Sequence, residues 1–486
     1  MTVPHEDPDA IRARLAALRD GDLPTHGGRT LAYVYDSGIA EADALGREAL
    51  ASYGATNGLD PTAFPSLLAM ERDLVAFAKP LFHAPGGAVG TVTSGGTESV
   101  LLAVQTARDA HPEIERPAMV VPSSIHAAFH KAAHYFGVER ITVPVDAGTL
   151  RADAAAIGDA LAAHAGRVVL VAASAPSYAH GVVDPIPEIA ELASQHGVRF
   201  HVDACIGGWV LPWLERDGLV QHPWDFSVEG VTSISADLHK YAYTPKGVSL
   251  LLHGSPDLRR PQFFASADWP GYTMLNATLQ STKSGGPLAA AWAVVSYFGD
   301  AGYHALARTA YDGSRALVEG IDRIEHLALA SQPDTTLVAI ATDDTCDVFT
   351  ISDAMLARGW FVQPQMAYAG IPATLHLTVS AATAPIVGDF LRALQESVDE
   401  AVAAGPIEVD PQLRAAAAAI DPATLDDAAF DGLLSLAGLA GGDAGAASSV
   451  TLPEQMAPVN ALLDAAPSGL REAMLVAFLD RLTRSQ

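Results

Sequence analysis

The chain has 486 residues, and its 29 Lys and Arg residues against 56 Asp and Glu residues give a formal net charge of -27 at pH 7. This acidity disfavours nucleic acid or an anionic membrane surface as a partner, because both would be repelled at long range. The two cysteines, Cys205 and Cys346, are too few for a disulfide framework or a thiolate metal site, so we expect a reducing, cytoplasmic location. The N-terminus lacks the basic and apolar pattern of a signal peptide, and no apolar run reaches membrane-spanning length, so we expect no membrane anchor.

The first 65 residues are expected to form an arm. Ile11, Leu15 and Leu18 recur with helical spacing, which predicts a short amphipathic helix over residues 9–20. A stretch punctuated by Gly and Pro follows, and it ends near Pro65. Residues 1–65 therefore read as an N-terminal arm with one helix.

Residues 66–302 show the pattern of a large α/β domain. Short apolar runs alternate there with alanine-rich helical stretches. This alternation predicts βα units and a mostly parallel sheet with helices on both faces. The expected strands span residues 118–121, 140–143, 168–172, 199–202, 233–235 and 248–252.

A second pattern begins after about Tyr303 and predicts a small α+β domain over residues 303–404. Residues 405–486 are dominated by Ala, Gly, Asp and Leu, and we interpret them as an alanine-rich helical extension. The expected elements are strands at 335–341 and 374–380 and helices at 348–358, 384–403 and 468–484.

A glycine-rich segment, Thr93 to Glu98, joins an apolar strand to the start of a helix. The backbone amides of Gly95 and Gly96, together with the hydroxyls of Ser94 and Thr97, would then meet at a helix N-terminus, which favours binding of a phosphate. The same sequence is also compatible with an ordinary glycine turn that is followed by a Ser or Thr helix cap. The interpretation as a phosphate site therefore needs further evidence from elsewhere in the chain.

That support comes from two runs, HVDAC at 201–205 and SADLHK at 235–240. Lys240, directly after a histidine at a strand end, suits a Schiff-base amine beside a phosphate contact. Asp203, at the carboxyl edge of the expected sheet, suits the ion pair that keeps a pyridine nitrogen protonated. Taken singly, Asp203 could cap a turn and Lys240 could be a solvated surface residue. With the glycine segment, they predict pyridoxal 5'-phosphate, whose protonated ring accepts an electron pair.

Lys240 must be partly neutral to form an imine. An apolar pocket with a second cation nearby would lower its pKa, and Lys246 could be that cation. His239 is a candidate contact for the cofactor phosphate, and otherwise a satisfied histidine at a loop start.

His126, His130 and His134 recur every four residues, which would align three imidazoles along one helix. Zinc is the first interpretation. Three consecutive turns of a straight helix are poorly placed to converge on one tetrahedral ion, and no further ligand stands out, so we expect no metal. His126, at the expected helix start, is better placed to stack on an aromatic cofactor.

From about Thr56 to Ala403 the chain resembles the sphingosine-1-phosphate lyases, within the pyridoxal-phosphate-dependent group II decarboxylases of fold type I. The resemblance implies that Lys240 forms the internal aldimine, that Asp203 pairs with the pyridine nitrogen and that His126 stacks on the ring. It also implies phosphate contacts from Gly95, Gly96, Thr97 and His239. The segments that carry it are FPSLLAMERDLVAFAKPLF, GTVTSGGTES, HAAFHKAAHYFG, ASAPSYAHGVVDPIPEIAEL, HVDACIGGWVLP, FSVEGVTSISADLHKYAYTPKG and, more weakly, DWPGYTMLNATLQSTKSGGPLAAAW.

The resemblance further implies a homodimer with active sites at the subunit interface. Ser281 and Thr282 would reach the partner's cofactor, and the N-terminal arm would wrap the neighbour. In such lyases a base removes the β-hydroxyl proton of an amine and the Cα–Cβ bond breaks in a retro-aldol step. Two alternatives stay open: an amino-acid decarboxylase of the same fold, and a catalytically silent binding subunit. The candidates for the base are Tyr178, His180 and Lys246.

The chain departs from the family pattern around the expected substrate pocket. Asn57-Gly58-Leu59-Asp60 stands where the family has Asn-Pro-Leu-His, so an anion replaces a potential cation. Met274 holds the position of a tyrosine, although Tyr272 lies two residues earlier, and Lys283 replaces an arginine and loses its bidentate fork. Three substitutions in one pocket suggest a changed substrate.

Overall fold

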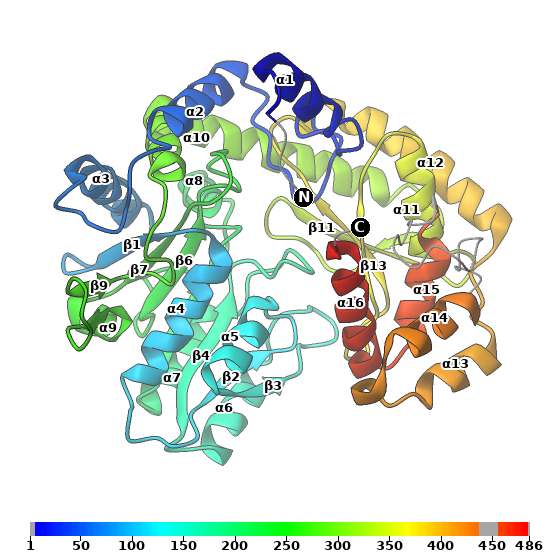
Figure 1. Ribbon diagram of the computed structural model, residues 1–486. Helices are drawn as coiled ribbons and strands as arrows, with labels where there is room; N and C mark the ends of the chain where they lie inside the picture. The colour runs from blue at the N-terminus through cyan, green and yellow to red at the C-terminus, as the bar shows by residue number, and fades with distance from the viewer. Residues whose placement is uncertain (1–4, 437–454, 485–486) are drawn as a thin grey trace.

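The computed structural model describes residues 5–436 and 455–484. A seven-stranded sheet forms the centre of the large domain in the order β1-β7-β6-β5-β4-β2-β3 (Figure 1). β7 runs antiparallel to both of its neighbours, and the pairs from β6 to β3 are parallel. The strands are β1 (Val89–Thr93), β2 (Ala118–Pro122), β3 (Glu139–Val143), β4 (Val168–Ser174), β5 (Arg199–Asp203), β6 (Ser233–Asp237) and β7 (Ser249–His253).

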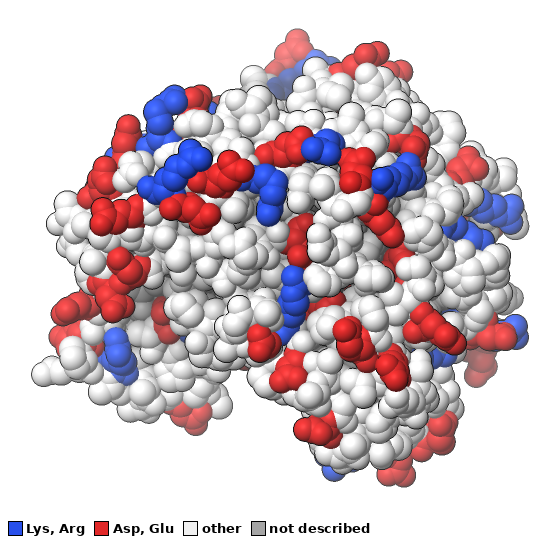
Figure 2. Space-filling view, turned by 180° about the vertical axis from the view of Figure 1, so that it is seen from behind, with Lys and Arg blue, Asp and Glu red and all other residues white. Residues whose placement is uncertain are grey.

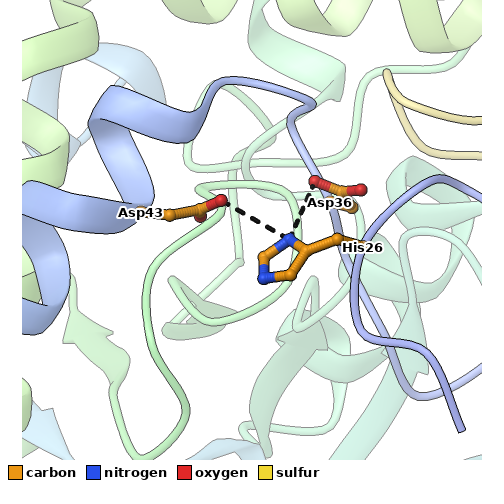
Figure 3. Close-up of side chains that lie close together, drawn as sticks. All are labelled: His26, Asp36 and Asp43. Atoms are coloured by element: carbon orange, nitrogen blue, oxygen red, sulfur yellow. Dashed lines mark ion pairs between the residues drawn. The ribbon is translucent and has the colours of Figure 1, made fainter.

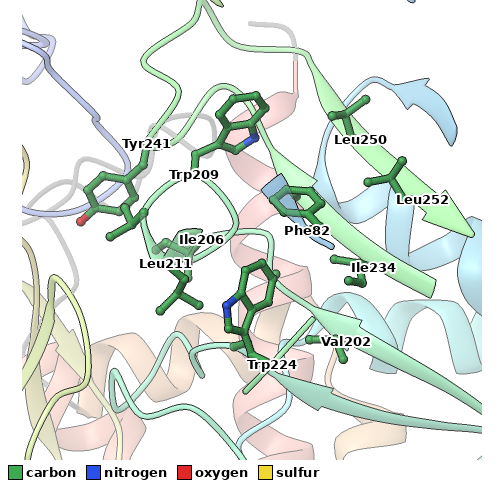
Figure 4. Packing of buried hydrophobic residues seen from close by; sticks show 14 of the residues in the cluster. Phe82, Val202, Ile206, Trp209, Leu211, Trp224, Ile234, Tyr241, Leu250 and Leu252 are labelled. Atoms are coloured by element: carbon green, nitrogen blue, oxygen red, sulfur yellow. The ribbon is translucent and has the colours of Figure 1, made fainter. Parts of the chain in front are cut away.

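The central strands are apolar because both faces of the sheet are covered. Along β2, Met119 and Val121 point into one core and Val120 points into another, as expected from the alternation of side chains in a strand. Figure 4 shows the second core, where Phe82 and Trp224 pack edge to face with ring centroids 5.6 Å apart. The helices around the sheet are α3 (Pro65–Leu81), α4 (Gly96–Asp109), α5 (Ala128–Phe136), α6 (Ala154–Ala163), α7 (Ile186–Gln195), α8 (Leu211–Arg216) and α9 (Pro256–Arg259). The predicted fold class is confirmed.

One long helix links the two domains. α10 (Gly286–Ile321) has 36 residues, and α2 (Ala40–Ser52) of the arm packs along it (Figure 1). Gly299 interrupts α10 with φ 54 and ψ -168, so the helix is broken there. The expected domain boundary at 302/303 falls inside α10, just after this break. Outside the sheet, α9 continues into η1 (Arg260–Gln262), and β8 (Phe264–Ser266) pairs with β9 (Met274–Asn276).

The small domain has a four-stranded antiparallel sheet in the order β10-β11-β13-β12. Its core also receives Leu31 from the arm, and Thr30 bridges to Phe361. The arm, which includes α1 (Pro8–Ala17), therefore contributes to this domain. The other elements are β10 (Leu327–Leu329), β11 (Leu337–Thr342), α11 (Val348–Ala357), β12 (Gln363–Gln365), β13 (Thr374–Thr378), η2 (Ala384–Ile386) and α12 (Val387–Ala404).

The C-terminal helices form a separate cluster beside the small domain. Phe430, Leu433, Leu470 and Met474 share a small core there. The helices are α13 (Pro411–Ala418), η3 (Pro422–Thr424), α14 (Asp427–Leu436), α15 (Ala457–Ala465) and α16 (Ser468–Thr483). In the view of Figure 2, acidic side chains are spread over the whole face with basic ones between them. Within the described residues, no helix has the length and apolarity needed to cross a bilayer.

Candidate active site

A cavity of about 390 Å³ opens where β4, β5 and β6 end, beside the loop that follows β1. This position, outside the carboxyl ends of the strands, is where open α/β sheets bind ligands. The structure brings most of the predicted cofactor residues to its wall: Ser94, Gly95, Gly96, Thr97, His126, Tyr178, Asp203, His239 and Lys240.

The glycine loop between β1 and α4 forms one side of the cavity. Gly95 has φ 152, which favours glycine. A Cβ on Gly96 would lie 2.7 Å from the nearest carboxylate oxygen of Asp237, so a larger residue would not fit without a shift. The first amides of α4 have no acceptor within the helix. The loop can therefore hold an anion such as a phosphate.

Glu98, which sequence reasoning missed, stabilises this loop through hydrogen bonds to backbone amides. Its carboxylate is buried and accepts from the amide of Ser94 at 2.6 Å and from the amide of Leu279 at 2.8 Å. The Glu in the TSGGTE run was the available signal, because a Glu in the first turn of a helix can reach back to free amides.

Asp203 ends β5 and is 7% exposed. Its Oδ1 accepts from the amide of Cys205 at 3.1 Å and from the hydroxyl of Ser235 at 3.3 Å. Within the described part of the chain, no donor bonds its Oδ2. A buried carboxylate with a free oxygen at a cavity wall suits a cationic N–H on a ligand ring.

Lys240 differs from the expectation in its charge state. Its Nζ lies 3.0 Å from Oδ2 of Asp237, a carboxylate that is 2% exposed. Burial disfavours the ammonium, but Asp237 and other nearby negative groups outweigh burial and raise the pKa of Lys240. The prediction of a lowered pKa was therefore wrong for this state of the protein. The missed partner lies inside the quoted SADLHK run, three residues before the lysine.

Lys246 carries the lowered pKa instead. Burial, and then the charge on Lys240, lower its pKa to about 8. Its Nζ donates to the carbonyl of Tyr33 at 2.9 Å and to that of His239 at 3.2 Å, and it lies 4.9 Å from the ring centroid of Tyr35. Tyr35, an arm residue that sequence reasoning missed, has its pKa raised to about 12 by burial.

His126 lies two residues before α5, so the expected stripe of three histidines on one helix does not form. Its Nδ1 accepts from the amide of Ala128 at 3.1 Å, and removal from water lowers its pKa. Its ring meets that of Tyr178 edge to face, with centroids 6.4 Å apart. Burial raises the pKa of Tyr178 and lowers that of His180 to about 4. His180 is not among the residues that line the cavity.

A second cavity, of about 1010 Å³, adjoins the first at Ser94 and contains part of the predicted substrate set. Asn57, Asp60, Thr282 and Lys283 line it. Asp60 is exposed, and its Oδ1 accepts from the amide and hydroxyl of Thr62 at 2.8 and 2.6 Å. Lys283 donates to the hydroxyl of Thr278 at 3.2 Å. Five predicted site residues line neither cavity: Lys246, His180, Ser281, Tyr272 and Met274. Tyr272 packs edge to face on Trp269.

Figure 3 shows a cluster away from this site, where His26 lies between two carboxylates. Its Nδ1 is 3.6 Å from Asp36 and 3.4 Å from Asp43. Both oxygens of Asp36 accept backbone amides, from Gly27 at 2.7 Å and Gly38 at 2.8 Å. These contacts hold the segment before α2 against the start of that helix, within the arm.

The first cavity fits pyridoxal phosphate on chemical grounds. It offers an anion-binding loop, a carboxylate with a free oxygen, a primary amine and an imidazole wall. Lys240 is the amine that would bond the cofactor aldehyde, and Asp203 is the acid that would face the ring nitrogen. These residue types match the three polar positions of that cofactor.

Comparison with known proteins agrees with this chemistry. The model of the pyridoxal-dependent decarboxylase conserved domain matches residues 32–342. A second model, for a C-terminal domain of pyridoxal-dependent enzymes that is named for a helix-turn-helix, matches residues 411–481.

The chain is 37% identical to the sphingosine-1-phosphate lyase of Arabidopsis thaliana over 78% of this chain and 70% of the plant protein. It is 35% identical to sphingosine-1-phosphate lyase 1 of Rattus norvegicus, over 80% and 68% of the two chains. The solved sphingosine-1-phosphate lyase of Burkholderia pseudomallei superposes with a TM-score of 0.77 and 32% identity, over 83% of this chain and 93% of the other. The glutamate decarboxylase of Lactobacillus brevis, with a TM-score of 0.73 and 19% identity over 83% and 95%, shares the fold.

Proposed function

Because the chain belongs to the pyridoxal-dependent decarboxylase family, as a lyase similar to the sphingosine-1-phosphate lyases, we propose that its substrate is a β-hydroxy amine of the sphingosine-1-phosphate kind. Cleavage would give an aldehyde and a smaller amine. The observation that carries this proposal is the meeting of Lys240, Asp203, His126 and the glycine loop in one cavity.

Each of these residues has a distinct task. Ser94 to Thr97 and His239 would hold the phosphate, and His126 would cover one face of the ring. Asp203 would keep the ring nitrogen protonated, and Asp237 orients the Lys240 amine at 3.0 Å. When bound, pyridoxal phosphate supplies the electron sink that stabilises negative charge at the substrate's Cα.

Among the three candidate bases, Lys246 is favoured. With its pKa at about 8, a useful fraction of this amine is neutral near physiological pH and can accept the β-hydroxyl proton. Tyr178 has a raised pKa, so its phenol stays protonated and can serve as a hydrogen-bond donor. Neither His180 nor Lys246 lines the cofactor cavity, but the lowered pKa of His180, about 4, makes its imidazole a much weaker proton acceptor.

The decisive experiment offers sphingosine-1-phosphate and, separately, a mixture of amino acids to the protein loaded with pyridoxal phosphate. We expect aldehyde from the first and no carbon dioxide from the second. Carbon dioxide without aldehyde would identify an amino-acid decarboxylase, and product from neither would contradict the proposal.

We also propose a homodimer. The second cavity adjoins the cofactor cavity, and Thr282 is among its lining residues, which supports a place for this loop near a cofactor site. Light scattering should give twice the chain mass of 50.5 kDa, and a monomer with full activity would contradict it. A cytoplasmic location and the domain limits at 65, 302 and 404 stay predictions.

A further inference from the structure

The loop between β4 and α7 carries Tyr178 into the cofactor cavity, although much of its support comes from the small domain. Gly181, at φ 72, packs so closely on β11 that a Cβ there would lie 2.3 Å from the carbonyl oxygen of Leu337. Small-domain residues also bond the loop backbone on both sides of this glycine. Before and at the glycine, three loop carbonyls accept hydrogen bonds: that of Ala179 from Gln365 Nε2 at 2.9 Å, that of His180 from Ser331 Oγ at 2.7 Å and that of Gly181 from the Asp334 amide at 3.0 Å. After the glycine, the Val183 amide donates to Asp334 Oδ2 at 2.7 Å.

His376 of β13 makes the contact that reaches the Tyr178 side chain itself. The two rings stack with centroids 4.0 Å apart and an angle of 27° between their planes. His376 is fully buried, and its Nε2 lies 2.9 Å from the hydroxyl of Thr378. The stacked phenol in turn meets His126 at 87°, at the cavity wall.

The stack is neutral. Burial, and then the neighbouring His180, lower the pKa of His376 to about 3, so the imidazole is uncharged at physiological pH. Flat packing of two uncharged rings is a favourable aromatic arrangement when the rings are offset. The contact therefore depends on the shape of the ring at position 376, and a phenyl ring could reproduce it.

We propose that His376 is a positioning residue for the active site: its imidazole fixes the Tyr178 phenol edge-on to His126, so that a small-domain strand sets the geometry of the cofactor cavity. The catalytic consequence rests on the proposed function, because it requires a cofactor in that cavity. The structural consequence, an ordered loop over residues 177–183, does not require one.

The test compares three variants of the full chain. His376→Ala removes the stack, and His376→Phe restores a flat ring. Leu377→Ala, one residue along β13, removes a fully buried side chain from the core on the other face of the strand and serves as the matched control. Amide hydrogen exchange of residues 177–183 is measured without cofactor, and visible circular dichroism and steady-state kinetics are measured after loading with pyridoxal phosphate.

We expect faster exchange in 177–183 and an altered visible dichroism for His376→Ala, with kcat for sphingosine-1-phosphate reduced about tenfold or more and KM changed less. His376→Phe should return all three readouts close to wild type. Leu377→Ala should lower the melting temperature and leave the dichroism unchanged.

If His376→Ala behaves like Leu377→Ala, or if His376→Phe fails to rescue a folded protein, the inference is wrong. A wild-type protein that takes up no cofactor would instead overturn the proposed function. The role of His376 in ordering the loop would still be tested, because amide exchange is measured without cofactor. If His376→Ala does not fold, His376→Phe carries the test, because altered dichroism and exchange in that variant would contradict a role based on ring shape.

Discussion

The two adjoining cavities hold their charged groups in different ways. In the cofactor cavity, Asp203 and Asp237 are 7% and 2% exposed and lie at the ends of neighbouring central strands. In the second cavity, Asp60 is exposed and bonds only within its own turn, while Lys283 bonds a nearby loop hydroxyl. The sheet therefore holds the acids predicted for the cofactor, and loops hold the residues predicted for the substrate, as in many enzymes whose sites sit on a rigid scaffold. Two other charged residues of the second cavity, Glu71 and Arg259, bond the backbone of β1 at Val92 and Gly90.

The largest effect should come from the amine in the cofactor cavity. Lys240→Ala should remove the visible absorbance band that borohydride bleaches and reduce activity about a thousandfold or more, because Lys240 is the one lysine among the described residues that line the cavity. Absorbance spectra before and after reduction check this. A reducible band that persists in the variant would show that another lysine bonds the cofactor.

Lys246 lines neither cavity, but the charge of Lys240 helps to lower its pKa. A base works only when neutral, so activity should rise as the pH increases through the pKa of about 8. Lys246→Met should reduce kcat/KM about a hundredfold and abolish this rising limb. The pH profile of kcat/KM measures both, and an unchanged limb in Lys246→Met would assign the proton transfer to another group.

Gly96→Ala should weaken cofactor binding about tenfold, which corresponds to about 1.4 kcal/mol. The added methyl group would meet the Asp237 carboxylate at 2.7 Å, against a wall that the sheet holds in place. Titration of the cofactor-free protein with pyridoxal phosphate gives the affinity. Gly388→Ala in α12, where a Cβ meets nothing within 4 Å, is the control that should bind normally. Equal affinity in both variants would mean that the glycine loop is not the phosphate site.

The smallest effect is expected in the second cavity. Hydrogen bonds from Thr62 lower the pKa of Asp60, so it stays an anion that repels a phosphate. Asp60→His combined with Lys283→Arg should improve kcat/KM for sphingosine-1-phosphate relative to the unphosphorylated amine by up to about tenfold.

Asp146→His is the matched control for this exchange, because Asp146 caps an equivalent turn through the amide and hydroxyl of Thr149. The ratio of kcat/KM for the two amines is the measurement. No gain over this control would place phosphate recognition elsewhere.

Contiguous sequence patterns predicted much of this structure. Six expected strands of the large sheet match β2 to β7 within about two residues at each end. The central ones, such as β2 and β4, are buried along their whole length and are therefore continuous apolar runs. The glycine loop, Asp203 and Lys240 follow such strands directly, and they meet because strand ends meet at one edge of a sheet.

The remaining features depend on contacts between distant segments. Tyr35 reaches the site from the arm, and His376 reaches Tyr178 from another domain; neither carries a local motif. The start of α5 was misplaced because periodic histidines suggested a helix, whereas a turn at Ser123–Ser124 delays it to Ala128. Tyr272 stays outside both cavities because its hairpin packs the ring on Trp269.

The break in α10 has an architectural consequence. At Gly299, φ 54 with ψ -168 is a backbone state that essentially only glycine adopts, while a Cβ would meet nothing within 4 Å, so the requirement is conformational and not steric. The helix stays with the large domain on both sides of this break, because Phe298 before it and Tyr303 and Ala310 after it pack in the same core. Only the last turns, from Leu317 to Ile321, join the core of the small domain. The kink at Gly299 therefore redirects the helix within the large domain, so that one continuous element follows the large core and still delivers its last turns to the small domain.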